Sequence, residues 1–130
     1  MKKSFGLVAG AALIALSSQA FAAAEVSEKI WVGKKIYDRA FGRGCGACHD
    51  ISSNPQLIDL IKKGELPKDR FATVIKEGKN GMPKASGAIM AVGPVKKANY
   101  TEDQAIDAVY SYLKGLGDGS VPAGKLKKKK

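Results

Sequence analysis

The stretch Cys45-Gly46-Ala47-Cys48-His49 contains both cysteines and the only histidine of this 130-residue chain. Two thiols and one imidazole this close together fit a redox disulfide, part of a metal site or an attachment point for a larger group. A thioredoxin-like redox pair belongs to a strand and helix fold, whereas the glycine-rich end of an expected helix precedes Cys45. Structural zinc takes four protein ligands, more than two cysteines and one histidine supply.

The pattern C-x-x-C-H is the attachment signal for c-type haem. Residues three apart on a helical turn face the same way, so both sulfurs can form thioethers with the two vinyl groups of one porphyrin. His49 then directs the unprotonated ring nitrogen at the iron. The motif therefore predicts one covalent haem c with its iron, bound by Cys45 and Cys48, with His49 as one axial ligand.

The other axial position cannot be filled by a second histidine, because the chain has none. Methionine, lysine, an oxygen ligand or an open site are the alternatives. Met82 lies between Gly81, which lets the chain approach a flat ring, and Pro83, which stiffens the backbone. Met90 has apolar neighbours typical of packing. These surroundings favour Met82 as the second ligand, with Met90 as the alternative.

The first residues have the anatomy of a secretory signal: a charged start, an apolar run from Phe5 to Leu16, and a small-x-small site ending at Ala22. We expect cleavage after Ala22 and export to the periplasm of a Gram-negative-like cell. An uncleaved anchor is the alternative, but the apolar run is shorter than the roughly 20 residues that span a membrane. The mature chain is therefore expected to have no transmembrane anchor.

The charge is unevenly distributed along the chain. There are 22 Lys and Arg against 12 Asp and Glu, and five of the lysines are Lys125 and Lys127 to Lys130. An exported chain without a recognition motif is not expected to bind nucleic acid. The basic segment favours an acidic partner or weak contact with an anionic membrane surface. A solvated tail without a specific role is the alternative, and residues 118–130 are expected to be flexible.

Helical spacing of apolar residues dominates the rest of the chain, and no alternating strand pattern is convincing. Thr101 and Gln104 predict a capping box at the start of the clearest helix. Residues 79–100 are rich in Gly, Pro and small residues, which predicts a long connection without regular structure. The expected helices run from Ser27 to near Gly42, from Leu57 to Lys63, from Pro67 to Gly78, and from Thr101 to Gly115 or Gly117.

With these features the chain resembles a class I (monohaem) c-type cytochrome from about residue 27 to residue 116. The resemblance rests on the haem motif, on the first helix at Gly33-Lys34-Lys35-Ile36-Tyr37, on Val109 to Lys114 in the last helix, and on Gly81-Met82-Pro83. It implies an all-α, small cytochrome c fold of about four helices around one covalent haem. Residues 1–22 are then the signal peptide, 23–117 the cytochrome c domain and 118–130 a flexible Lys-rich tail.

The resemblance also implies roles for single residues. A glycine, here Gly33, allows the first and last helices to cross closely, and an aromatic residue, here Tyr37, packs on the last helix. In the family a proline carbonyl accepts a hydrogen bond from the ligand histidine, and Pro55 is the candidate. Some members place a tryptophan near a haem propionate, a role that does not transfer to Trp31 in the first helix.

The expected function is that of a periplasmic one-electron carrier rather than an enzyme. A His49 and Met82 pair fills both axial positions and leaves no place for a substrate. The partners are redox proteins with acidic docking surfaces, steered by lysines near the haem edge. These lysines are Lys34, Lys35, Lys84, Lys96 and Lys97. The alternatives are a haem subunit of a larger periplasmic oxidoreductase complex, or a ligand-binding or peroxidatic haem protein.

Overall fold

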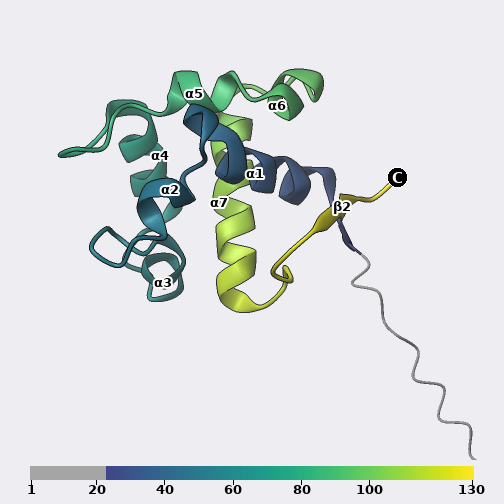
Figure 1. Cartoon of the computed structure of the whole chain (residues 1–130), viewed down its shortest axis with the longest axis horizontal. Coiled ribbons are helices and arrows are strands. Elements are labelled where there is room, and N and C mark those ends of the chain that lie inside the picture. The colour runs from purple at the N-terminus through teal and green to yellow at the C-terminus, as the bar shows by residue number, and fades with distance from the viewer. Residues whose placement is uncertain (1–22) are drawn as a thin grey trace, which may run out of the picture.

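The long helix α7 (Glu102–Asp118) is the element on which the rest of the chain packs. A computed structural model describes residues 23–130, so the predicted signal peptide at residues 1–22 lies outside the described residues. The other elements are β1 (Ala24–Val26), α1 (Glu28–Arg39), the 3-10 turn η1 (Ala40–Gly42), α2 (Gly46–His49), α3 (Leu57–Lys62), α4 (Lys68–Glu77), α5 (Ser86–Met90), α6 (Gly93–Lys97) and β2 (Leu126–Lys128). The predicted all-α class is confirmed, with one small sheet added (Figure 1).

The first and last long helices, α1 and α7, cross in close contact. A Cβ on Gly33 would collide with the carbonyl of Ala108 and would lie 2.9 Å from Tyr112 Cβ. Four residues further on, the ring of Tyr37 packs on that of Tyr112 at a centroid distance of 6.1 Å and a tilt of 56°. The predicted roles of Gly33 in the crossing and of Tyr37 on the last helix are confirmed.

Replacing Gly33 with Ala is expected to lower the free energy of unfolding by about 1–3 kcal/mol or more, because the added methyl group meets backbone and must push the helices apart. Denaturant unfolding of the haem-loaded protein measures this loss. Gly87→Ala is the matched control, because a Cβ at this helical position meets nothing within 4 Å. An equal loss in both variants would contradict the close crossing.

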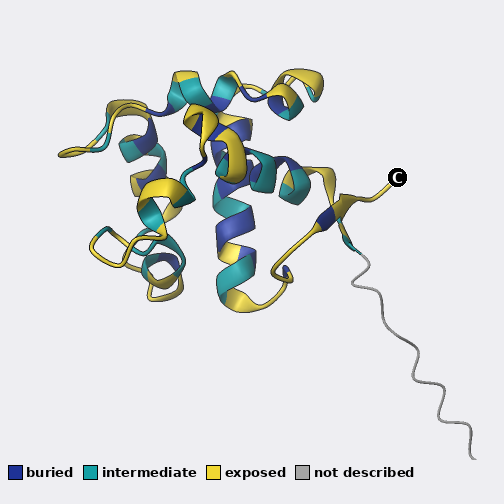
Figure 2. Cartoon of the chain, viewed as in Figure 1, coloured by how far each residue is buried: buried dark blue, intermediate teal, exposed yellow. Residues whose placement is uncertain are grey.

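The hydrophobic core lies between α7 and the helices that surround it, as the buried segments in Figure 2 show. The largest fully buried side chains are Val32, Ile36, Ile89, Val95, Ile106, Val109 and Leu113. Where α4 meets α7, the ring centroids of Phe71 and Tyr110 lie 5.3 Å apart. The Tyr110 hydroxyl donates to the Leu66 carbonyl at 3.0 Å. This contact attaches α4 and the segment before it to α7.

The last helix starts as predicted but ends later. Thr101 caps it, with both hydrogen bonds of the capping box to Gln104. The expected end at Gly115 or Gly117 is wrong, since the helix continues to Asp118 and Gly119 adopts the left-handed conformation that terminates it. Gly115 is needed for packing instead, because a Cβ there would lie 3.0 Å from Val121 Cβ.

The connection between α4 and α7 contains regular structure that the sequence did not reveal. Residues 79–100 were expected to lack it, and the structure corrects this with α5 and α6. Each of these helices has only five residues, too few to display a 3.6-residue period. Ile89, Val92 and Val95 from this segment are buried in the core, which explains why the segment is held in place.

The basic segment at residues 118–130 is also more ordered than expected. Val121 and Leu126 are buried, and β2 pairs in parallel with β1, with Leu126 opposite Ala24. The expectation of a flexible tail is therefore corrected: two apolar residues hold the lysines of β2 against the start of the described chain. None of the described helices is long and apolar enough to cross a membrane.

Candidate haem-binding site

A tight turn at the end of α1 positions the first cysteine. Phe41, Gly42 and Gly44 all have positive φ values, between 60° and 86°. A Cβ on Gly44 would lie 2.6 Å from the Tyr37 carbonyl oxygen, so only glycine fits there. The Cys45 amide donates to the same Tyr37 carbonyl at 2.8 Å. The cysteine motif therefore begins directly against the last turns of α1.

The first cysteine caps the one-turn helix α2, and the second cysteine and the histidine lie in it. The His49 amide donates to the Cys45 carbonyl at 3.0 Å, which closes the turn. Both thiols are free, Cys48 exposed and Cys45 half-buried. Burial raises the pKa of the Cys45 thiol to about 11, so this sulfur is a protonated thiol at neutral pH until it is modified. The structure thus brings together the three residues that the motif predicts.

The ring of His49 is fixed by one backbone hydrogen bond. Its Nδ1 lies 2.9 Å from the Pro55 carbonyl oxygen. A carbonyl oxygen only accepts, so Nδ1 carries the proton and Nε2 keeps its lone pair for a metal. The contact with Pro55 that the family resemblance implies is therefore present. Such a partner orients a ligating imidazole and raises its basicity.

Two side-chain amides whose role was not predicted from the sequence shape the loop that carries the Pro55 carbonyl. The Asn54 amide donates to the Cys48 carbonyl at 2.8 Å. The Gln56 amide donates to the carbonyls of Ile51 and Asn54 at 2.8 and 3.0 Å. Asn54 thereby ties the loop to α2, and Gln56 closes the loop on itself on the other side of Pro55. The sequence feature that could have predicted this role is the pair of amide residues that flank a proline just after the motif.

Helix α2 is also tied to α1 by a tyrosine and a carboxylate. The Tyr37 hydroxyl donates to Asp50 Oδ1 at 2.8 Å. Burial, followed by this hydrogen bond, raises the pKa of Tyr37 well above its usual value, so the hydroxyl keeps its proton. A side chain on Gly46 would collide with the Asp50 carboxylate and displace it from the Tyr37 hydroxyl. Tyr37 therefore serves both the helix crossing and the haem-binding turn.

Met82 lies on a closed turn between α4 and α5. Lys79 and Met82 exchange two backbone hydrogen bonds of 3.0 and 2.9 Å, and Asn80 has φ 52°. Gly78 ends α4 with φ 77°, and a Cβ there would lie 2.8 Å from the Met82 carbonyl oxygen. The Met82 side chain is half-buried at the edge of the core. Met90 is half-buried too, but it lies on a helix.

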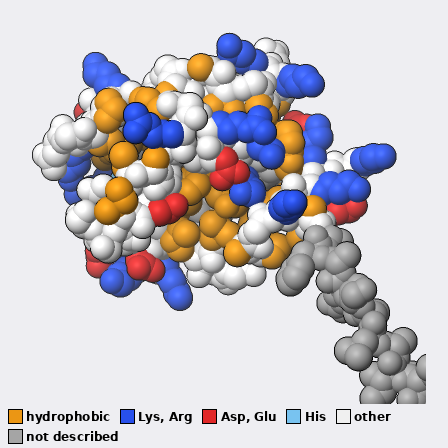
Figure 3. Space-filling model, in the orientation of Figure 1, with side chains coloured by type: hydrophobic (Ala, Val, Ile, Leu, Met, Phe, Trp, Pro, Cys, Tyr) orange, Lys and Arg blue, Asp and Glu red, His pale blue; other side chains and the backbone are white. Residues whose placement is uncertain are grey.

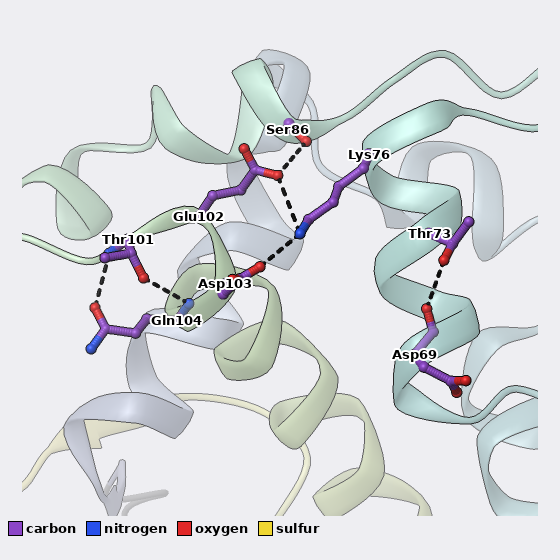
Figure 4. A network of polar contacts seen from close by, with 8 residues as sticks. All are labelled: Asp69, Thr73, Lys76, Ser86, Thr101, Glu102, Asp103 and Gln104. Carbon is purple, nitrogen blue, oxygen red and sulfur yellow. Dashed lines mark hydrogen bonds and ion pairs between the residues drawn. The ribbon is translucent and has the colours of Figure 1, made fainter.

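A polar network holds both sides of this turn to the start of α7 (Figure 4). Lys76 near the end of α4 pairs with Asp103 at 2.7 Å and with Glu102 at 3.9 Å. Ser86 at the start of α5 donates to the same Glu102 carboxylate at 3.2 Å. The ion pair lowers the pKa of Asp103 and raises that of Lys76. The network thus fixes the two ends of the segment that carries Met82.

The arrangement defines a class of protein. In the view of Figure 1, α2 and the segment between α4 and α5 lie on the same side of α7. One turn carries two thiols that can attach a haem covalently and an imidazole whose Nε2 can bind its iron. A half-buried thioether lies on a separate turn. Together with the crossing of α1 and α7, these features are those of a class I c-type cytochrome.

Comparison with known proteins agrees with this class. The family model described as cytochrome c matches residues 32–117, and the chain belongs to this family. It is also 34% identical over 134 aligned residues to "Cytochrome c-555" of Methylococcus capsulatus, covering 98% of this chain and 95% of that protein. No solved structure matches the chain. The cofactor is therefore a covalently bound haem c with its iron, and the protein is an electron-transferring c-type cytochrome.

Proposed function

We infer that the chain is a periplasmic monohaem carrier that passes one electron at a time between redox proteins, with His49 and Met82 as axial ligands. The hydrogen bond between His49 Nδ1 and the Pro55 carbonyl carries this inference. This bond would keep the imidazole in one orientation and one tautomer when a metal bound at Nε2 gains or loses an electron. A rigid first ligand limits rearrangement during electron transfer.

Other residues of the chain attach the haem, exclude water from it and hold the haem-binding turn against the core. Bound haem c supplies a one-electron iron couple. Cys45 and Cys48 hold the group covalently, so it is not lost between encounters. The apolar side chains around α7 exclude water and give a low dielectric, which favours the less charged reduced state. The Tyr37 and Asp50 pair keeps the haem-binding turn attached to this core.

Two observations support Met82 over Met90 as the second ligand. The turn from Lys79 to Met82 is closed by its own hydrogen bonds, and its flanks are attached to α7, so the thioether has a defined position. Pro83 follows directly and limits the backbone further. Met90, in contrast, follows the buried Ile89 in α5, where a side chain is used for packing. A methionine ligand raises the reduction potential relative to a second histidine.

Partner recognition is proposed to use exposed lysines. Lys84, Lys96 and Lys97 are exposed, and no ion pair is recorded for them within residues 23–130. Lys34 instead pairs with Asp38 at 2.8 Å, and Lys35 lies over the Trp31 ring at 5.2 Å. The first three are therefore the lysines best able to attract an acidic docking surface. Such encounters are weak and weaken further with salt.

Location and processing complete the proposal. Residues 1–22 are proposed to be a signal peptide removed after Ala22, which places the mature chain in the periplasm. The described chain then begins at Ala23, one residue before β1. Since β2 pairs with β1, we treat residues 23–130 as a single domain in which residues 118–130 take part.

Carbon monoxide distinguishes this carrier from a ligand-binding haem protein. The reduced holoprotein is expected to show no spectral change at neutral pH under 1 atm of carbon monoxide, because both axial positions are filled. The Met82→Ala variant is the positive control and is expected to bind the gas. Rapid binding by the wild-type protein would contradict the proposal and favour a ligand-binding or peroxidatic function.

A further inference from the structure

We propose that the lysines on and beside β2 form a binding surface for anionic phospholipid membranes. The surface, here called the basic end, consists of Lys125, Lys127, Lys128, Lys129 and Lys130. All five are exposed, whereas Leu126 between them is 8% exposed and packs into the core. Binding here would be a property separate from electron transfer, and it does not depend on the proposed function.

The fold presents these lysines in fixed positions. The strands pair in parallel, with Glu25 opposite Lys127 and Val26 opposite Lys128. Two further backbone hydrogen bonds extend the pairing: Ala24 donates to the Lys125 carbonyl at 3.2 Å, and Lys129 donates to the Val26 carbonyl at 2.9 Å. Because the segment is already ordered in the free protein, binding costs less conformational entropy.

Most of the positive charge at the basic end is available to a partner. Lys128 pairs with Glu28 at 3.1 Å and lies over the Trp31 ring at 5.8 Å. Within residues 23–130, no ion pair is recorded for Lys125, Lys127, Lys129 or Lys130. The exposed Glu25 lies opposite Lys127 in the strand pairing. The surface therefore carries a positive excess that an anionic layer would complement.

The basic end lies away from the haem-binding turn. In Figure 1, β2 lies on one side of α7, and α2, α3 and α4 lie on the other. In the same orientation, several Lys and Arg side chains lie at the end of the molecule that carries β2, beside an acidic side chain, and others are spread over the rest of this face (Figure 3). A chain held by the basic end would therefore turn α2 and the Met82 segment away from the membrane and leave them open to redox partners.

The type of charge favours a lipid surface over an acidic protein. All five lysines lie within six consecutive residues, and clusters of about four to eight basic residues are typical of segments that bind anionic lipid. Lysine acts as a hydrated point charge and lacks the fork geometry of arginine. Two surface pockets are lined by residues of other segments: one lies between α2 and α3, and the other lies between η1 and α5. Clustered basic residues attract anionic lipid without needing a pocket.

Sedimentation with vesicles tests the proposal on the haem-loaded mature protein. The wild-type protein is expected to bind phosphatidylcholine vesicles containing 30% phosphatidylglycerol at 20 mM salt, and to be released as salt rises. The triple variant Lys127→Gln, Lys129→Gln and Lys130→Gln is expected to bind about a hundredfold more weakly, from about 1 kcal/mol for each lysine near the surface. Lys128 is retained because it holds Glu28.

The matched control removes the same charge elsewhere. Lys62 at the end of α3, Lys63 directly after it and Lys114 of α7 are exposed, and their change to Gln is expected to alter affinity less than threefold. An equal loss in both triple variants would mean that net charge alone acts, and would overturn the proposal. Equal binding to pure phosphatidylcholine vesicles would overturn it too. So would binding to a polyglutamate peptide but not to the anionic vesicles, which would assign the surface to an acidic protein.

Discussion

A chain with both Cys45→Ser and Cys48→Ser is expected to contain no covalently attached haem. Thioether bonds form only at sulfur, and these are the only two cysteines of the chain. Both sulfurs lie on one helical turn, and no other residue of the motif carries a sulfur that could replace them. Haem staining after denaturing electrophoresis measures the effect, and the expected signal is that of the background.

The single variants and a control separate attachment from folding. Cys48→Ser leaves one thioether position and is expected to give a reduced signal with a shifted absorption maximum, because one vinyl group stays unmodified. Ala47→Ser is the matched control: this exposed residue lies between the cysteines, and its change adds a hydroxyl without removing a thiol. Haem that stays attached in the double variant would refute the role of both cysteines.

Local sequence signals predicted the haem-binding turn and the starts of the long helices. Cys45, Cys48 and His49 lie within one turn, so their arrangement depends on residues that are neighbours in the chain. The side chains of Ser27 and Thr101 cap α1 and α7 in the structure. Capping acts over three residues and can therefore be read directly from the sequence.

The features that the sequence did not predict depend on contacts that form only when the chain folds. Gly115 resembles a helix terminator, but its lack of a side chain makes room for Val121. Leu126 looks like an isolated apolar residue among lysines until β1 supplies a partner strand. The Asn54 amide acquires its role only once the loop folds back onto α2, and the Gln56 amide only once the loop closes on itself. In each case the physical reason is a tertiary contact, which a local pattern does not contain.

The second large effect is expected from Met82→Ala. Removing the thioether opens one axial position, so the weak charge-transfer band of ferric iron bound to methionine sulfur, at the near-infrared edge of the visible spectrum, is expected to disappear. The reduction potential is expected to fall by on the order of 0.1 V or more, within the roughly 0.8 V that axial ligands span. Absorption spectroscopy and redox titration measure the two changes.

Met90→Ala is the matched control for this experiment, because it deletes the same side chain from another half-buried position eight residues further on. The loss of packing there is expected to lower the free energy of unfolding by about 2 kcal/mol or more, while the band and the potential stay close to those of the wild type. The opposite pattern, with the band kept in Met82→Ala and lost in Met90→Ala, would assign the ligand to α5. The closed turn at residues 79–82 would then serve only to connect α4 to that helix.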